Sequence, residues 1–222
     1  MASSAPLQSV SLYLNHARTV LTNTDNLLEG GFWCGWFALT ALDLKQSITE
    51  RTNLNSLPDG ATKAGAIWSA NQKVLAAGFS TISGGSMVLT WLHGLQLFPL
   101  GKLFPFVSSF GYVGSCISAL LKAGSAVQDI QGGTIAFFQA ATLAERGHVA
   151  LFQIQKMLQL ALYVSIAAWG ALGSVHSLVG GATLFKIMDT FFYYAVVVFF
   201  MYVAAFCTLP SALPEKPISE LR

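Results

Sequence analysis

Charged residues are scarce in this chain of 222 residues. Asp, Glu, Lys and Arg make up 10 % of it, whereas about 25 % is usual in soluble domains. The net charge is only +2, and the basic residues are scattered, which argues against nucleic-acid binding. Because hydrophobic residues make up 54 % of the sequence, this composition predicts a protein that resides in a membrane.

Cysteine is equally scarce, and its three positions exclude several kinds of site. Cys34, Cys116 and Cys207 are far apart in the sequence, so no disulfide framework, zinc motif or redox pair is predicted. The first ten residues contain no Lys or Arg followed by an apolar core. A cleaved signal peptide is therefore not expected.

Motifs that carry enzymatic chemistry are also missing. The chain has no glycine-rich phosphate loop ending in Lys-Ser/Thr, no His-Glu-x-x-His and no Gly-x-Ser-x-Gly. Acidic residues occur singly, whereas membrane transferases and proteases need carboxylates or activated nucleophiles near the membrane surface. We therefore expect neither catalysis nor a required cofactor.

The chain does contain four long apolar stretches that lack Asp, Glu, Lys and Arg, at residues 74–101, 103–121, 157–185 and 190–214. About 20 apolar residues in a helix cross the hydrocarbon of a bilayer. Only Lys102 separates the first two stretches, and only residues 186–189 separate the last two. The sequence therefore predicts an all-α, polytopic membrane protein with four transmembrane helices in two tight hairpins, at residues 74–121 and 157–209.

Three further regions surround these hairpins. Residues 1–73 are predicted to form an amphipathic and interfacial helical region, in which a helix over residues 10–28 stops at Gly30-Gly31. Residues 31–42 are apolar but too short to span, so they form either an interfacial anchor or a helix packed on the spanning bundle. Residues 122–156 are expected to form a central loop or helix broken at Gly132-Gly133, and residues 210–222 a disordered tail.

The distribution of basic residues predicts the orientation in the membrane. Ten of the twelve Lys and Arg lie in the N-terminal region, the central segment and the tail, and the two hairpin turns hold only Lys102 and Lys186. By the positive-inside rule, both termini and the central segment are expected in the cytoplasm.

Two histidines are the candidate site residues. A weak internal repeat at an offset of 83 residues aligns His93 with His176, each about ten residues before a hairpin turn. Imidazoles on facing helices could ligate a haem or a metal, or relay a proton. Alternatively, both rings pack structurally and bond to neighbouring Ser hydroxyls or backbone carbonyls.

Small residues are frequent in the first three stretches, for example at Ser83-Gly84-Gly85-Ser86 and Gly180-Gly181. Such surfaces let helix backbones approach closely. They predict either packing between the two hairpins or homo-oligomerisation within the lipid bilayer.

The hairpin arrangement resembles one known family. Apolar hairpins with short turns, at residues 99–102 and 180–189, lie between tails predicted to face the cytosol, as in the bilobed hydrophobic domains of chlamydial inclusion-membrane proteins. Those proteins are secreted by a type III apparatus, and the Ser-rich, uncharged residues 1–11 are similar to such a secretion signal. The resemblance covers residues 74–209. It implies a secreted bacterial effector inserted in a host-derived vacuole membrane, where exposed segments recruit host proteins.

Together, these patterns predict a non-catalytic membrane protein that acts by membrane residence and protein–protein interaction. The alternative is a small transporter or channel subunit, or a haem-binding redox membrane protein, that uses His93 and His176.

Overall fold

The computed structural model describes residues 5–56 and 60–208, and this part of the chain is almost entirely helical. Two short 3-10 turns, Leu54–Ser56 and Gly101–Leu103, lie between longer helices. The α-helices are α1 (Ala5–Leu21), α2 (Thr24–Asn53), α3 (Ala61–Gly94), α4 (Phe104–Gln139), α5 (Leu143–Val179) and α6 (Ala182–Thr208). The predicted disordered tail, residues 210–222, lies outside the described residues.

Four of these helices are long and apolar enough to cross a membrane. They cover Lys63–Gly94, Gly101–Gln139, Leu143–Val179 and Ala182–Thr208. The α3–α4 pair and the α5–α6 pair correspond to the two predicted hairpins. The predicted fold, an all-α protein with four membrane-spanning helices, is therefore confirmed.

The central segment does not break where the sequence predicted. Helix α4 continues through Gly132-Gly133 to Gln139, and α5 begins only at Leu143. Thr142 caps α5, because its hydroxyl accepts from Glu145 N while the Glu145 carboxylate accepts from Thr142 N. The packing of α4 against α5 outweighs the low helix propensity of the glycine pair, so both helices project well beyond an ordinary span.

The helix end predicted at Gly30-Gly31 is also wrong. Helix α1 ends at Leu21, and Asn23 caps a second helix by accepting a hydrogen bond from Asp25 N. Helix α2 then passes through Gly30-Gly31, because Gly30 leaves room for the Trp91 indole of α3. The apolar residues 31–42 thus lie in the middle of a 30-residue helix that packs on α3.

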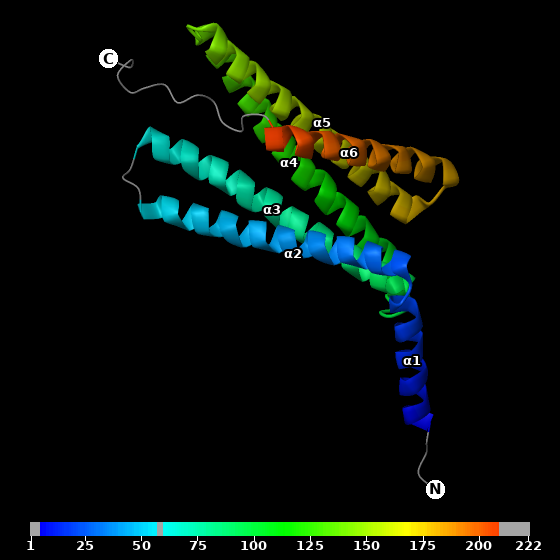
Figure 1. The fold of residues 1–222 in the computed structure, drawn as a ribbon. Helices are drawn as coiled ribbons and strands as arrows, with labels where there is room; N and C mark the ends of the chain where they lie inside the picture. Colours follow the sequence, from blue (N-terminus) through cyan, green and yellow to red (C-terminus); the bar gives the residue numbers. More distant parts are fainter. Residues whose placement is uncertain (1–4, 57–59, 209–222) are drawn as a thin grey trace.

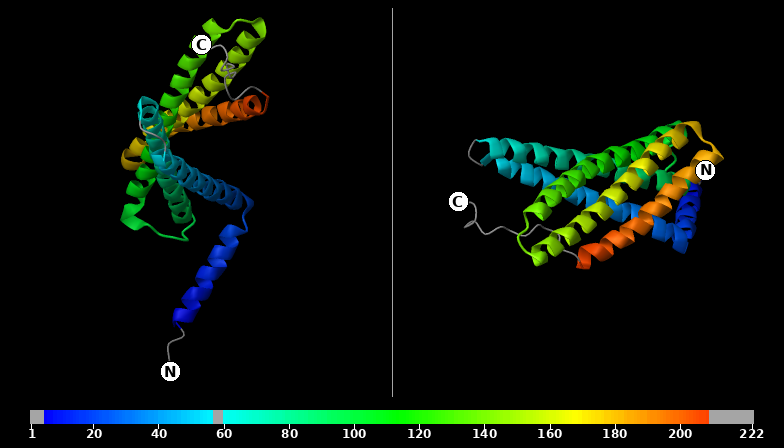
Figure 2. Two further views of the ribbon diagram at one scale, coloured as in Figure 1. Left: turned by 90° about the vertical axis from the view of Figure 1, so that its left-hand side faces the viewer. Right: turned by 90° about the horizontal axis from the view of Figure 1, so that it is seen from above.

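Helices α2 to α6 lie side by side in the order of the chain, and each packs on its sequence neighbours (Figures 1 and 2). The described parts of α3 and α5 do not pack on each other, because α4 lies between them. The helices converge at the end that contains the α3–α4 and α5–α6 turns. At the opposite end, the α2–α3 tip and the α4–α5 tip diverge (Figures 1 and 2).

Small residues allow the central helices to approach closely. A Cβ on Gly170 of α5 would lie 2.6 Å from Tyr112 O of α4, and a Cβ on Gly114 would lie 2.8 Å from Phe79 O of α3. Between α3 and α4, Ser83 pairs with Ser115 at an Oγ–Oγ distance of 2.5 Å. Such contacts replace the hydrophobic driving force that is absent between helices in lipid.

The N-terminal helix lies at the end of the layer that contains the turns. The Tyr13 hydroxyl donates to Leu97 O at 2.5 Å, and the His16 ring lies 3.0 Å from Leu95 O. Helix α6 runs away from the α5–α6 turn and ends at Thr208, at the other end of the layer (Figure 1). Helix α1 and the end of α6 are therefore separated by the length of the spanning helices.

Candidate functional site

His93, the first predicted site residue, closes the α3–α4 turn. It lies in the last turn of α3, and its Nδ1 accepts a hydrogen bond from Leu100 N at 3.0 Å. Its ring lies on Phe104, with the centroids 4.4 Å apart. These contacts connect the end of α3 to the start of α4.

His176 occupies the equivalent place before the α5–α6 turn. Its ring centroid lies 5.4 Å from that of Phe185, and its buried Nδ1 has no hydrogen-bond partner. The chain reverses after it through Gly180 and Gly181, whose φ angles of 75° and 110° favour glycine.

The structure does not bring the two imidazoles together. His93 contacts the start of α4, whereas His176 contacts the start of α6, and α4 separates their helices. Within residues 5–56 and 60–208, no three His, Cys, Asp or Glu side chains form a group that could hold a metal ion. The histidines share a depth and a position relative to a turn, but not a site.

A polar cleft of about 350 Å³ lies elsewhere, where α2, α3, α4 and α5 leave the apolar zone. Its walls combine carboxylates, ammonium groups and amides. They are Asp43, Gln46, Ser47 and Glu50 of α2; Gln72, Lys73 and Ala76 of α3; Leu121, Lys122, Ser125, Ala126 and Asp129 of α4; and Gln159 and Tyr163 of α5.

Three ion pairs surround this cleft, and each connects two helices. Lys73 of α3 lies 3.3 Å from Glu50 of α2, and Lys122 of α4 lies 3.6 Å from Asp43 of α2. Lys156 of α5 lies 2.7 Å from Asp129 of α4. Charges at the edge of the membrane are thus neutralised between neighbouring helices, which lowers the cost of placing them there.

The pairs differ in how tightly they are held. The Lys156 side chain is only 17 % exposed and makes the shortest contact of the three. Lys122 and Asp43 are 32 % and 50 % exposed, and their distance is too long for a strong hydrogen bond. The Lys122–Asp43 pair is therefore the one that a polar ligand could most easily separate.

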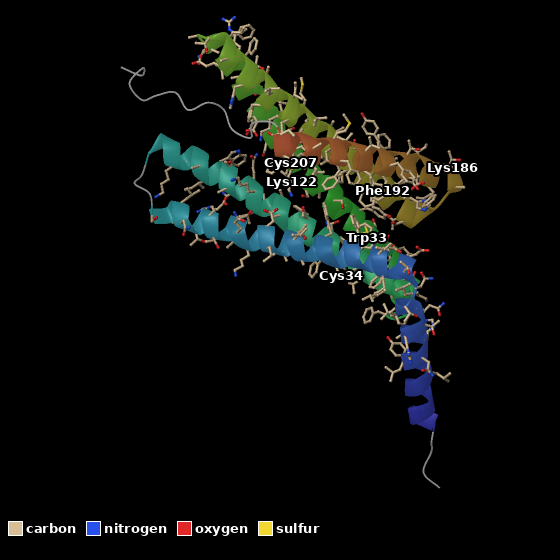
Figure 3. The ribbon with its side chains drawn as sticks, viewed as in Figure 1. Trp33, Cys34, Lys122, Lys186, Phe192 and Cys207 are labelled. Atoms are coloured by element: carbon tan, nitrogen blue, oxygen red, sulfur yellow. The ribbon has the colours of Figure 1, made fainter. Side chains whose placement is uncertain are left out.

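A separate apolar groove of about 540 Å³ lies next to the cleft, on the side of the turns. Trp33 of α2 and Phe192 of α6, both labelled in Figure 3, line it from two helices. Its walls are Gly31, Phe32, Trp33, Gly35, Trp36 and Leu39 of α2; Leu162, Ile166 and Trp169 of α5; Phe192, Ala195, Val196 and Phe199 of α6; and Ser115 of α4.

Two polar side chains of the groove have hydrogen-bond partners outside it. The Ser115 hydroxyl pairs with Ser83, and Trp33 Nε1 donates to Glu29 Oε1 at 3.4 Å. The groove therefore presents an apolar surface, whereas the adjoining cleft presents charges and amides. Neither His nor Cys is among the described residues that line the two cavities, and the charged groups that line the cleft are the carboxylates and ammonium groups of Asp, Glu and Lys.

Sequence reasoning missed this site. Asp43 and Lys122 counted only as charges next to apolar stretches, and Asp129 was not singled out. The available signal was that Asp43 and Lys122 carry opposite charges and that each directly follows an apolar stretch. Their convergence depends on the order of the helices, which the pattern does not specify.

Comparison with known proteins supplies no family for this chain. No protein-family model matches it, and no significant match was found among curated proteins or among solved structures.

Proposed function

We propose that this chain is a non-catalytic membrane-inserted protein that acts by membrane residence and by contact with other proteins. The observation that carries the proposal is the α4–α5 arm, in which the end of α4 and the start of α5 extend together beyond the membrane-spanning part of these helices. From Lys122 to Gln139, α4 extends for about 26 Å at 1.5 Å per residue, and the start of α5 accompanies it.

The tip of the α4–α5 arm exposes large apolar side chains. Phe138 is 79 % exposed and Leu143 is 86 % exposed, and they lie on either side of the turn. Exposed apolar surface outside the bilayer is typical of sites that bind another protein. Its position at the tip favours a partner that approaches from the aqueous side.

The charge distribution supports a cytoplasmic position for this arm. If α2 crosses the bilayer beside α3, the α2–α3 tip lies on the same side as the α4–α5 arm. Nine of the twelve Lys and Arg then lie on that side, including the two in the C-terminal tail. Only Arg18, Lys102 and Lys186 lie on the turn side. The positive-inside rule is satisfied by this arrangement.

This arrangement differs from the sequence prediction for the N-terminus. The sequence predicted both termini in the cytoplasm, whereas a crossing α2 would place α1 on the other side. We favour the crossing because Gly30 lies against Trp91 and Gly84 lies against Phe37, so that α2 follows α3 through the spanning zone.

The resemblance to chlamydial inclusion-membrane proteins extends the proposal to a cellular setting. There the chain would be a secreted effector in a host vacuole membrane, and the cytoplasmic arms would meet host proteins. The apolar hairpins and the uncharged, Ser-rich start support this setting.

Single-cysteine accessibility tests the topology. After replacement of the native cysteines, the variants Arg18→Cys, Lys102→Cys and Arg146→Cys are treated with a membrane-impermeant thiol reagent from the cytoplasmic side. We expect labelling at residue 146 alone. Labelling at residue 18 in addition to residue 146 would show that α2 does not cross. Labelling at residue 102 in addition to residue 146 would contradict the two-hairpin arrangement.

Proximity labelling then tests the role of the arm. The double variant F138Q/L143Q should insert normally but lose the neighbours labelled by the wild-type protein. Val179→Gln is the matched control, because Val179 is also 79 % exposed but lies at the turn end. An unchanged set of neighbours in the double variant would refute the proposal.

The alternative use of His93 and His176 in transport or haem binding finds no support in their geometry. A shared cofactor or proton path would need the two rings on one cavity, and each ring instead packs beside its own turn. The groove that does run along the spanning helices is apolar.

A further inference from the structure

We propose that the groove and the cleft together bind one phosphatidylethanolamine molecule. An acyl chain would lie in the apolar groove between α2 and α6. The phosphate would meet Lys122, and the primary ammonium would meet Asp43.

The groove lies at the depth of membrane hydrocarbon. Its α2 wall runs beside the apolar part of α3, as shown by the contact of Gly84 with Phe37. Its α5 and α6 walls belong to helices of membrane-spanning character. An open apolar groove at this depth is accessible to lipid chains rather than to water.

The two cavities lie next to each other along α2 and α5. On α2 the apolar wall ends at Leu39 and the polar wall begins at Asp43, one helical turn later. On α5 the surface runs from Gln159 in the cleft to Trp169 in the groove, about 15 Å at 1.5 Å per residue. That length matches about half of the 30 Å hydrocarbon thickness, which is one leaflet.

The charges favour a zwitterionic headgroup with N–H donors. Asp129 is held by Lys156 at 2.7 Å and Glu50 by Lys73 at 3.3 Å, which leaves the carboxylate of Asp43 and the ammonium of Lys122 to face a ligand. Asp43 and Lys122 are 3.6 Å apart and partly exposed, so a phosphate and an ammonium could insert between them without a net change in charge. A choline headgroup fits less well, because its quaternary nitrogen cannot donate hydrogen bonds to the carboxylate of Asp43.

A bound lipid would also fill a gap in the helix layer. In the described part of the chain, α2 packs on α3 but not on α5 or α6. The opposing aromatic walls therefore face each other across the groove. An acyl chain there would connect the α2–α3 pair to the α5–α6 pair.

Tryptophan quenching by brominated lipids provides the test. Trp33, Trp36 and Trp169 line the groove, whereas Trp68 and Trp91 do not. The full chain is reconstituted in phosphatidylcholine vesicles with a small mole fraction of acyl-brominated phosphatidylethanolamine, phosphatidylcholine or phosphatidylglycerol. We expect the ethanolamine lipid to bind about tenfold more tightly than the other two, since it adds a charge-assisted hydrogen bond.

Variants separate the headgroup site from the groove. The double variant D43N/K122M should remove the preference for ethanolamine, whereas Lys186→Met, a charge change at the turn end, should keep it (Figure 3). Gly35→Phe should fill the groove, because a Cβ there meets no atom within 4 Å. Gly124→Phe is its control, since Gly124 has equal space but does not line the groove.

Three outcomes would overturn the proposal. Equal quenching of the wild-type protein by all three lipids would remove the headgroup site, and stronger quenching by phosphatidylglycerol would contradict its charge. Selective quenching that persists in Gly35→Phe would place the lipid outside the groove. The lipid comparison uses the wild-type protein, so it remains decisive if a variant fails to fold.

Discussion

Replacement of Gly170 by alanine should separate the two helices that form the centre of the layer. The new Cβ would lie 2.6 Å from Tyr112 O, 2.8 Å from Cys116 N and 3.1 Å from Cys116 Cα. All three are backbone atoms of α4, so no side-chain rotation can make room. Since ordinary contacts begin at 3.4 Å, α4 and α5 must move apart by about 0.8 Å at this point.

The expected cost follows from overpacking. Extra atoms in a well-packed interior cost about 1–3 kcal/mol, which lowers the folding equilibrium constant about fivefold to 150-fold. The loss should be measured as the shift in midpoint when SDS is titrated into the protein in mild detergent, with near-ultraviolet circular dichroism as the probe. The ring contact of Tyr112 with Trp169, at 5.0 Å between centroids, should report the separation directly.

Gly124→Ala is the matched control on α4. A Cβ there meets no atom within 4 Å, so this variant should be as stable as the wild type or slightly more stable, because alanine favours a helix. A Gly170→Ala protein that unfolds at the wild-type midpoint would refute the close approach of α4 and α5 at this level.

The same titration checks two further predictions. Ser83→Ala should lower the free energy of unfolding by about 1 kcal/mol, because it leaves the Ser115 hydroxyl without its partner, and S83A/S115A should cost less than the sum of the single variants. Lys156→Met should cost about 1–2 kcal/mol, since it removes the short contact of a mostly buried ammonium with Asp129. Lys73→Met should cost less than about 1 kcal/mol, because that side chain is 60 % exposed; equal losses for the two lysines would contradict the difference in burial.

The spanning helices could be predicted because their signal is local. Long runs without charge identify α3 to α6, and Pro99, Gly101 and the Gly180-Gly181 pair mark the reversals between them. The continuation of α2 through Gly30-Gly31 and of α4 through Gly132-Gly133 could not be predicted in the same way. A glycine pair weakens a helix locally, but here a packed neighbour stabilises each helix, and that neighbour is distant in the sequence.

The two histidines show that the functional site, too, could be predicted from local sequence only in part. The repeat predicted similar positions for His93 and His176, about ten residues before each turn. In the structure the helices end only one and three residues after them, and each ring packs on a phenylalanine beside its turn. Whether two such residues meet depends on which helices are neighbours. Helix α4 lies between the helices of the two histidines and separates them, whereas the Lys122 side chain of α4 still reaches Asp43 of α2, two helices away in the order.

Helix α2 shows why hydropathy alone underestimates the part of the chain that accompanies the spanning helices. Its apolar residues 31–42 are too few to span, and the charges of Glu29 and Asp43 lie on either side of them. In the structure, Glu29 accepts from Trp33 Nε1 and Asp43 pairs with Lys122 of α4. A charge neutralised by a neighbouring helix costs less near the membrane than its own sequence suggests. If α2 crosses, the pairing of Asp43 with Lys122 lowers the cost of placing Asp43 at the edge of the membrane. The double variant D43N/K122M should then leave the accessibility at residue 18 unchanged, whereas Lys122→Met alone should reduce the insertion of α2 by leaving Asp43 unpaired.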